Sequence, residues 1–185
     1  MPSLLSLDPA RARAIRLLAL DVDGVLTDNG IWIGPVHGAL TEFKRFDIRD
    51  GLGLVLLRGS GIAVLWISSR PSPATAQRAA ELRIDDVLQL DGRPKLEALD
   101  EVLSARGVAW SDVAYAGDDL ADLAVMRRAG LPLTVPGAVP EIRAVSAGVT
   151  LTPGGHGAVR EIIEALLRAR GEWDAIVARY AGAPA

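Results

Sequence analysis

Short apolar runs alternate with helix-length amphipathic segments along the whole chain, and this alternation limits the possible folds more than any other feature. Three runs are strongly apolar and end in polar residues, at 15–22, 62–69 and 112–119. Such runs are typical of strands that are buried on both faces of a parallel sheet. The segments between them are long enough to cross over as helices on both faces. The sequence therefore predicts an α/β fold with a doubly wound parallel sheet.

The remaining segments continue this β-α rhythm within what we expect to be one domain over residues 1–185. Ser72 and Pro73 are the expected N-cap and first residue of one helix. Residues 30–43 break the rhythm and predict a β-hairpin insertion, and the tail over 171–185 is expected to be partly helical and then flexible. Further strands are predicted at 86–90, 131–135 and 149–152, and helices at 50–61, 72–83, 95–107, 120–130, 139–148 and 156–171.

Acidic residues follow two of the strong strands at the point where each strand ends. Asp21 and Asp23 end the first run, and Asp118 ends the third. Ligands of doubly wound sheets bind beyond the carboxyl ends of the strands, and these acids would share that edge. Carboxylates brought so close repel one another unless a cation lies between them. We therefore expect Mg²⁺, held by the carboxylates of Asp21 and Asp118 and by the backbone carbonyl of Asp23.

A phosphate group fits the same arrangement. Ser68 ends the second strong strand and can donate to one phosphoryl oxygen, while Lys95 can reach another. The carboxylate of Asp23 stays free to act as an acid or a base. An aspartate nucleophile beside a metal, a hydroxyl and a lysine indicates aspartyl-phosphate chemistry.

Composition excludes several other classes of protein. The formal net charge of −3 gives no basic excess for nucleic acid or an anionic membrane surface. The chain contains no cysteine, which excludes disulfides, thiolate metal sites and a cysteine nucleophile. The apolar runs are shorter than the roughly 20 residues that span a bilayer, and no signal peptide is evident. We expect a cytoplasmic protein.

The segments DVDGVLTD, ISSR and GDDLAD, together with Lys95, resemble in order and approximate spacing the four motifs of the haloacid dehalogenase-like phosphatases. FKRFDIRDGLGLVLL, SSRPSPATAQRAAELRI and PGGHGAVREIIEALL are similar to a nearly capless branch of that superfamily. This branch includes 3-deoxy-D-manno-octulosonate 8-phosphate phosphatase. The resemblance covers roughly residues 15–168 and implies a Rossmann-like fold with the hairpin in place of a cap domain.

The resemblance implies a role for each motif residue. Asp21 would be the nucleophile, and Asp23 would protonate the leaving sugar oxygen and then deprotonate the hydrolytic water. Ser68 and Lys95 would hold the phosphoryl oxygens. The remaining residues would complete the metal site, surround it or line the sugar pocket: Asp118 as a ligand, Asp119 and Asp122 around the ligands, and Arg49, Asp50, Gly51, Arg70 and Arg78 against the anionic sugar, with Asp23 and Lys95 also touching the substrate.

The implied function is Mg²⁺-dependent hydrolysis of a phosphorylated keto-deoxy sugar acid, with 3-deoxy-D-manno-octulosonate 8-phosphate as the leading substrate and surface-sugar biosynthesis as the context. Asp47 and Val55 depart from the branch pattern in the sugar pocket, so a nine-carbon 9-phosphate or another small phosphate ester is an alternative. A receiver-type phosphoacceptor domain and an inactive partner domain are further alternatives. The branch also implies a homotetramer that packs through the hairpin, which carries Ile31, Trp32, Ile33 and Val36.

Overall fold

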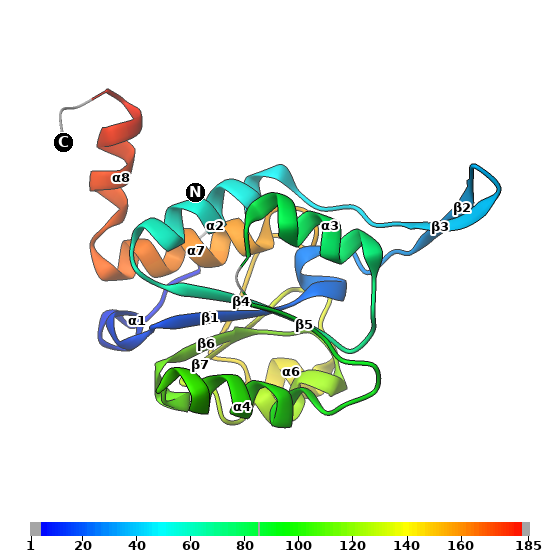
Figure 1. Cartoon of the computed structure of the whole chain (residues 1–185). Helices are drawn as coiled ribbons and strands as arrows, with labels where there is room; N and C mark the ends of the chain where they lie inside the picture. The colour runs from blue at the N-terminus through cyan, green and yellow to red at the C-terminus, as the bar shows by residue number, and fades with distance from the viewer. Residues whose placement is uncertain (1–4, 85, 183–185) are drawn as a thin grey trace.

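The computed structural model describes residues 5–84 and 86–182, and its centre is a six-stranded parallel sheet. The strands lie in the order β5-β4-β1-β6-β7-β8. Helices α2, α3 and α7 cover one face of the sheet, and α4 and α6 cover the other (Figure 1). The expected doubly wound α/β fold with a small hairpin is confirmed.

The strands and helices follow the predicted alternation closely. The strands are β1 (Leu17–Asp21), β2 (Trp32–Val36), β3 (Ala39–Phe43), β4 (Ala63–Ser68), β5 (Asp86–Gln89), β6 (Val113–Ala116), β7 (Leu131–Thr134) and β8 (Gly148–Val149). The helices are α1 (Pro9–Ala14), α2 (Ile48–Gly59), α3 (Pro73–Leu82), α4 (Lys95–Arg106), α5 (Leu123–Met126), α6 (Pro140–Val145), α7 (Ala158–Arg170) and α8 (Trp173–Tyr180). Short turns η1 (Val22–Leu26), η2 (Trp110–Asp112) and η3 (Leu120–Asp122) link some of them.

Local interactions explain where the structure differs from the sequence prediction. The strand predicted at 149–152 ends at Val149, because the amides of Leu151 and Thr152 donate to the carboxylate of Glu161. Helix α1 was not predicted, and Asp8 caps it by accepting from the amides of Ala10 and Arg11. The tail after Gly171 includes α8, whose Trp173 and Ile176 are buried.

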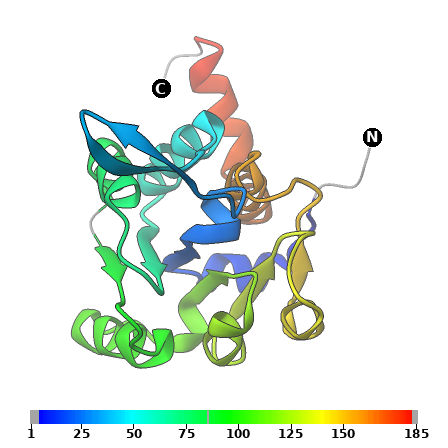
Figure 2. The same cartoon turned by 90° about the vertical axis from the view of Figure 1, so that its right-hand side faces the viewer.

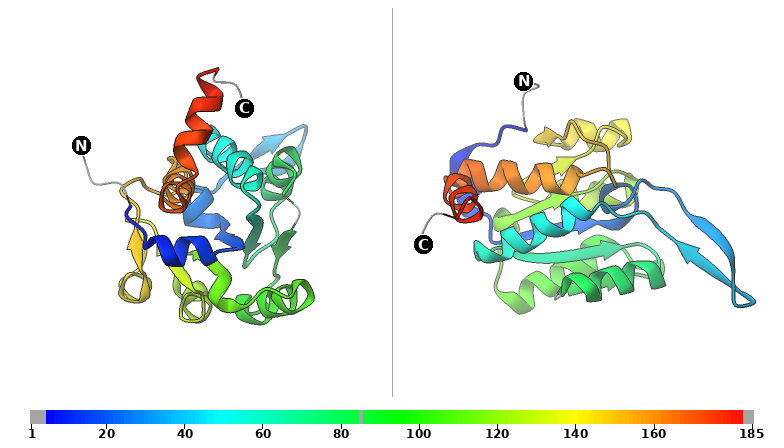
Figure 3. Two further views of the ribbon diagram at one scale, coloured as in Figure 1. Left: turned by 90° about the vertical axis from the view of Figure 1, so that its left-hand side faces the viewer. Right: turned by 90° about the horizontal axis from the view of Figure 1, so that it is seen from above.

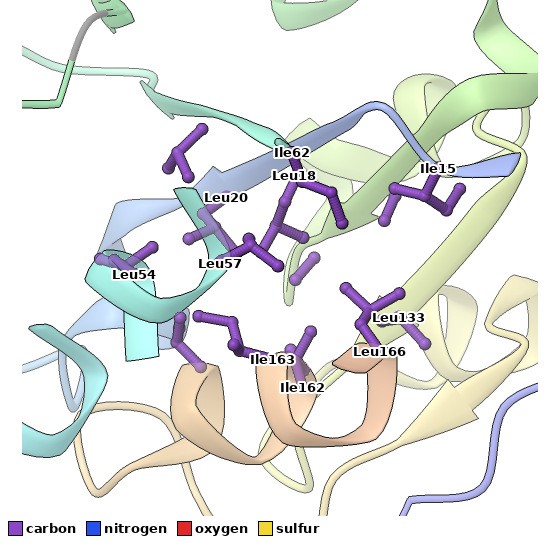
Figure 4. Close-up of a cluster of buried hydrophobic side chains, with 14 of the residues drawn as sticks. Ile15, Leu18, Leu20, Leu54, Leu57, Ile62, Leu133, Ile162, Ile163 and Leu166 are labelled. Carbon is purple, nitrogen blue, oxygen red and sulfur yellow. The ribbon is translucent and has the colours of Figure 1, made fainter. Parts of the chain in front are cut away.

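Successive residues of β1 supply two separate hydrophobic cores. Leu18 and Leu20 point into the cluster beneath α2 and α7, where Leu54 and Ile162 join them (Figure 4). The alternate residues of the strand pack on the opposite face with α4 and α5. This alternation follows from the two-residue period of a strand and fixes β1 at the centre of the molecule. Among the described residues, no helix combines the length and the apolarity that crossing a membrane needs.

The chain reverses its direction across the sheet at β1. Strands β4 and β5 lie on one side of β1, whereas β6, β7 and β8 lie on the other. The crevice at the carboxyl ends of β1 and β6 is thus the topological switch point, where ligands of such sheets bind. Figure 2 looks onto this edge, and the β2–β3 hairpin leaves from it and projects beyond the body of the molecule (Figures 1 and 3).

Asp50 joins two helices on the covered face of the sheet. It lies in the first turn of α2, and its Oδ1 accepts a hydrogen bond of 2.7 Å from the backbone amide of Arg160 in the first turn of α7. That amide has no partner within its own helix, so Asp50 acts as a cap from a neighbouring helix. Its Oδ2 is buried without a hydrogen-bond partner. Burial raises the pKa of Asp50 to about 7.

We expect this carboxyl to make stability depend on pH. The Asp50 carboxyl ionises near a pKa of about 4 in the unfolded chain, so only the folded state keeps its proton between about pH 4 and pH 7. Its contribution to stability therefore falls as pH rises through that window. Asp50→Asn keeps an oxygen for Arg160 and cannot ionise. The free energy of unfolding of the variant relative to the wild type should rise by up to about 4 kcal/mol from pH 4 to pH 7 in urea denaturation. A difference that stays constant over this range would contradict the assignment.

Candidate active site

The predicted catalytic acids meet at the carboxyl edge of β1 and β6. Asp21 is the last residue of β1, and Asp118 follows β6 by two residues. Both are buried, and together with Asp122 they offer carboxylate oxygens that lie within 4.8 Å of one another. Asp23 lies two residues after Asp21, in the tight turn η1 that the amide of Thr27 closes on the carbonyl of Val22. The pairing of β1 with β6 is what brings the acids together.

Lys95 lies between two of these carboxylates. Its Nζ donates to Asp21 Oδ1 at 2.6 Å and to Asp122 Oδ1 at 2.7 Å, and the side chain is almost completely buried. Burial alone lowers the pKa of Lys95, but Asp21 and Asp122 outweigh it and raise the pKa above its usual value. The ammonium group therefore stays charged at neutral pH, and one permanent cation faces the acid cluster.

Asp122 has no free oxygen for a metal ion. Its Oδ1 also accepts from the hydroxyl of the buried Tyr115, and its Oδ2 accepts from the amides of Asp118 and Asp119. These bonds hold Asp122 as the anchor of Lys95 rather than as a ligand. Tyr115 is a residue that the sequence analysis missed, because an aromatic residue within an apolar strand has no signal that separates it from a core residue.

The negative charge of the acid cluster is not balanced by Lys95 alone, and a divalent cation would balance it. Burial and the neighbouring Asp122 raise the pKa of Asp21 well above its usual value, and the same two causes raise the pKa of Asp118 to about 6. Asp118 Oδ1 is buried without a hydrogen-bond partner. Carboxylate oxygens in this setting are the ligands that Mg²⁺ prefers. The residues present fit such an ion.

A cavity of about 310 Å³ opens beside the cluster. Seven of the predicted site residues line it, and these are Asp21, Asp23, Arg70, Lys95, Asp118, Asp119 and Asp122. Asn29, Ile31 and Ser69 complete much of its wall. Nη2 of Arg70 is buried without a hydrogen-bond partner, although the same guanidinium pairs with Glu42 through Nη1 at 2.6 Å.

Ser68 is buried at the end of β4, and its role toward a phosphoryl oxygen stays a prediction. Its hydroxyl donates to the carbonyl of Arg70 at 3.1 Å, and Ser69 rather than Ser68 lines the cavity. The predicted hydrogen bond from Ser68 to a phosphoryl oxygen would require the hydroxyl to turn away from its own loop.

Four residues predicted for the sugar pocket lie away from this cavity. The Arg49 guanidinium pairs with Asp47 at 2.8 Å and lowers the pKa of that carboxyl to about 2. Arg78 pairs with Glu81 beside the backbone of Gly51. Asp50 faces α7. Within one chain, these residues do not line the cavity beside Asp21.

Two glycine contacts fix the turn that carries Asp23. Gly24 has a φ of +97°, and a Cβ there would lie 1.9 Å from Asp118 Oδ2. A Cβ on Gly154 would lie 1.8 Å from the carbonyl oxygen of Gly24. The loop before α7, with the sequence PGGHG, therefore packs directly on the backbone of η1.

Comparisons with known proteins agree with this geometry. No family model matches the sequence. The chain is 41% identical over 165 residues to the 3-deoxy-D-manno-octulosonate 8-phosphate phosphatase KdsC of Escherichia coli (strain K12), across 89% of this chain and 86% of that protein. It is 39% identical over 160 residues to KdsC of Yersinia pestis, across 86% of this chain and 83% of that protein.

Solved structures show the same similarity in three dimensions. The 3-deoxy-D-manno-octulosonate 8-phosphate phosphatase from Moraxella catarrhalis, in complex with a magnesium ion, a phosphate ion and KDO, superposes with a TM-score of 0.87 and 41% identity, over 93% of this chain and 97% of that chain. The cobalt-bound phosphatase from Haemophilus influenzae superposes with a TM-score of 0.79 and 34% identity, over 87% and 92% of the two chains.

Gly24 offers a direct test of the cation site. In Gly24→Ala the new methyl group would displace Asp118, and we expect the Kd for Mg²⁺ to rise at least about tenfold in calorimetric titration. Gly61→Ala is the matched control, because Gly61 also has a positive φ of +77° but has no atom within 4 Å of a built Cβ. Both variants bear the backbone strain of about 1–2 kcal/mol, so only the loss of metal affinity should separate them. Equal Kd values in the two variants would contradict the placement of the ion at Asp118.

Proposed function

Because the chain belongs to the 3-deoxy-D-manno-octulosonate 8-phosphate phosphatase family, we propose that it is a Mg²⁺-dependent phosphatase that hydrolyses 3-deoxy-D-manno-octulosonate 8-phosphate. The observation that carries this proposal is the group formed by Asp21, Lys95 and Asp118 at a cavity of about 310 Å³. The relative from Moraxella catarrhalis, which was crystallised with magnesium, phosphate and KDO, supports the substrate class.

The carboxylates of Asp21 and Asp118 and the backbone carbonyl of Asp23 are the groups that would hold Mg²⁺. A bound Mg²⁺ supplies positive charge that offsets the repulsion among these acids and neutralises a phosphoryl oxygen. The ammonium group of Lys95 lies at Asp21 and would also face the phosphoryl group.

In the proposed first step, a carboxylate oxygen of Asp21 attacks phosphorus, and the bond between phosphorus and the sugar oxygen breaks. Asp23 lines the same cavity and gives its proton to that leaving oxygen. In the second step, Asp23 takes a proton from water, which attacks phosphorus and releases phosphate from Asp21. The two steps consume one water and one phosphate ester, and they return both aspartates to their starting forms.

Arg70 is the basic residue best placed to meet an anionic sugar. It lines the cavity, and its Nη2 is buried without a hydrogen-bond partner. A guanidinium in that position can bind a carboxylate. Roles of Arg49, Asp50, Gly51 and Arg78 in substrate binding stay predictions, as does the cytoplasmic location.

The proposal predicts phosphate release with Mg²⁺ from 3-deoxy-D-manno-octulosonate 8-phosphate, with a kcat/KM at least about tenfold above that for a nine-carbon 9-phosphate. Asp21→Asn, which removes the attacking oxygen while nearly preserving its shape, should lose at least about 10⁴-fold in kcat. Steady-state phosphate assays on both esters measure this. A preference for the nine-carbon ester would contradict the proposed substrate and indicate that Asp47 and Val55 have changed the specificity. An active Asp21→Asn would overturn the mechanism.

We also propose that the chain forms a homotetramer through the hairpin. Apolar side chains on both faces of the β2–β3 ribbon are exposed, including Trp32 at 69%, Ile33 at 68% and Leu40 at 82%. Exposed apolar surface of this kind is costly on a monomer. A second copy of the chain would bury it.

The oligomer proposal predicts a tetramer for the wild type in sedimentation equilibrium and smaller species for Leu40→Glu, because a buried carboxylate in an apolar interface is strongly unfavourable. Leu151→Glu changes an exposed leucine outside the hairpin and serves as the control that should remain tetrameric. A monomeric wild type, or a tetrameric Leu40→Glu, would contradict the proposal.

A further inference from the structure

Lys44 brings a buried charge from the end of the hairpin to the predicted acid–base residue. It follows the last residue of β3, and its Nζ forms an ion pair of 2.6 Å with Asp23 Oδ1. The side chain of Lys44 is 0% exposed, whereas that of Asp23 is 23% exposed. Asp23 lines the cavity, and Lys44 is not among the described residues that do so. Lys44 therefore reaches Asp23 from within the protein rather than from the cavity.

Three groups account for the burial of this ammonium. In addition to Asp23, Nζ donates to Oγ1 of Thr75 at 3.2 Å and lies 4.0 Å from Glu42 Oε1. Thr75 is itself fully buried in α3. Removing a charge from water is costly unless its partners are well placed. A lysine held in this way is pinned to the helix on one side and to Asp23 on the other.

A second cation faces the other oxygen of Asp23. Nε of Arg70 lies 3.3 Å from Asp23 Oδ2, and Glu42 binds the same guanidinium at 2.6 Å. Ser72, the N-cap of α3, donates to Glu42 in turn. The hydrogen bond that Arg70 donates to Glu42 is the main cause that raises the pKa of Arg70, so this guanidinium is a permanent charge. Each oxygen of Asp23 thus faces a cation from outside the turn that carries it, and the contact of Oδ1 with Lys44 is an ion pair without a hydrogen bond.

We propose that Lys44 is a positioning residue for proton transfer, which holds the carboxyl group of Asp23 at the place where the oxygen of the leaving group departs. This inference deepens the proposed phosphatase function and rests on it. The backbone of the turn is packed by the loop before α7, but the orientation of the Asp23 carboxylate depends on the cations that reach its two oxygens. The ion pair with the buried Lys44 fixes Oδ1. It also makes the hairpin part of the catalytic apparatus through Asp23.

Substrates with different leaving groups can distinguish a positioning role of Lys44 from a merely structural one. A sugar alkoxide is a poor leaving group and needs a proton from Asp23 as the bond to phosphorus breaks. p-Nitrophenolate leaves without a proton. The value of kcat/KM reports the reaction up to the transfer of the phosphoryl group to Asp21, so the later hydrolysis does not enter the comparison.

The principal variant is Lys44→Met, which keeps the length of the side chain and removes the ammonium. We expect its kcat/KM to fall about 100-fold for 3-deoxy-D-manno-octulosonate 8-phosphate and by less than about threefold for p-nitrophenyl phosphate. Thr75→Val removes the hydroxyl that holds Lys44 at nearly constant volume, and it should give a smaller loss, about fivefold, with the same selectivity. Arg93→Met is the control for loss of one positive charge, because Arg93 is exposed and pairs with Glu101.

Each outcome decides between distinct conclusions. If the wild type releases no phosphate from either ester, the proposed function fails before this inference is reached. If Lys44→Met loses activity equally on both esters, or on neither, the positioning role is wrong while the function stands. Thermal unfolding shows whether Lys44→Met is folded, and if it is not, the selectivity of Thr75→Val decides. A selective loss in Arg93→Met would show that net charge, not position, is responsible.

Discussion

The repulsion among buried carboxylates at the ends of β1 and β6 is the constraint around which the rest of the site is built. Asp21 and Asp118 are buried with Asp122 within a few ångströms of one another. Parallel strands bring their carboxyl ends to one edge, so the same topology that buries β1 on both faces creates this cluster. Lys95 neutralises part of the negative charge. The unpartnered oxygen of Asp118 marks where a further cation would neutralise the rest.

The residues around the cluster mainly keep its carboxylates from moving apart. Tyr115 and two backbone amides hold Asp122, which holds Lys95, which in turn holds Asp21. On the opposite side, Gly24 leaves no space between the turn η1 and Asp118, and Gly154 packs on the backbone of Gly24. A rigid arrangement of this kind lowers the reorganisation needed when charge develops in the transition state. The hairpin adds Lys44 as a further support, at Asp23.

Much of the fold followed from local patterns in the sequence. Continuous apolar strands predicted the parallel sheet, and Ser72 with Pro73 marked the start of α3 correctly. Three acids placed after strands were sufficient to predict that Asp21, Asp23 and Asp118 share one edge. These signals are readable because strand period, capping and the geometry of parallel sheets act over short stretches of chain.

Contacts between distant segments could not be predicted in the same way. Nothing near Lys44 in the sequence indicates that its ammonium is buried at Asp23, since this depends on how the hairpin leaves the sheet. Nothing near Asp50 in the sequence indicates that it caps α7, which is more than 100 residues away in the chain. Ser68 ends its strand as predicted, but the loop after it binds the hydroxyl through the carbonyl of Arg70.

The central claim is that Asp21 receives the phosphoryl group, and chemical trapping of this acyl phosphate tests it most directly. Borohydride reduces an aspartyl phosphate to homoserine, whereas free carboxylates do not react. The enzyme would be quenched with borohydride during turnover of 3-deoxy-D-manno-octulosonate 8-phosphate with Mg²⁺, and its peptides would be analysed by mass spectrometry. We expect homoserine at position 21, and only when substrate is present. Homoserine at position 23 or 118, or an unmodified Asp21 in an enzyme that is turning over, would contradict it.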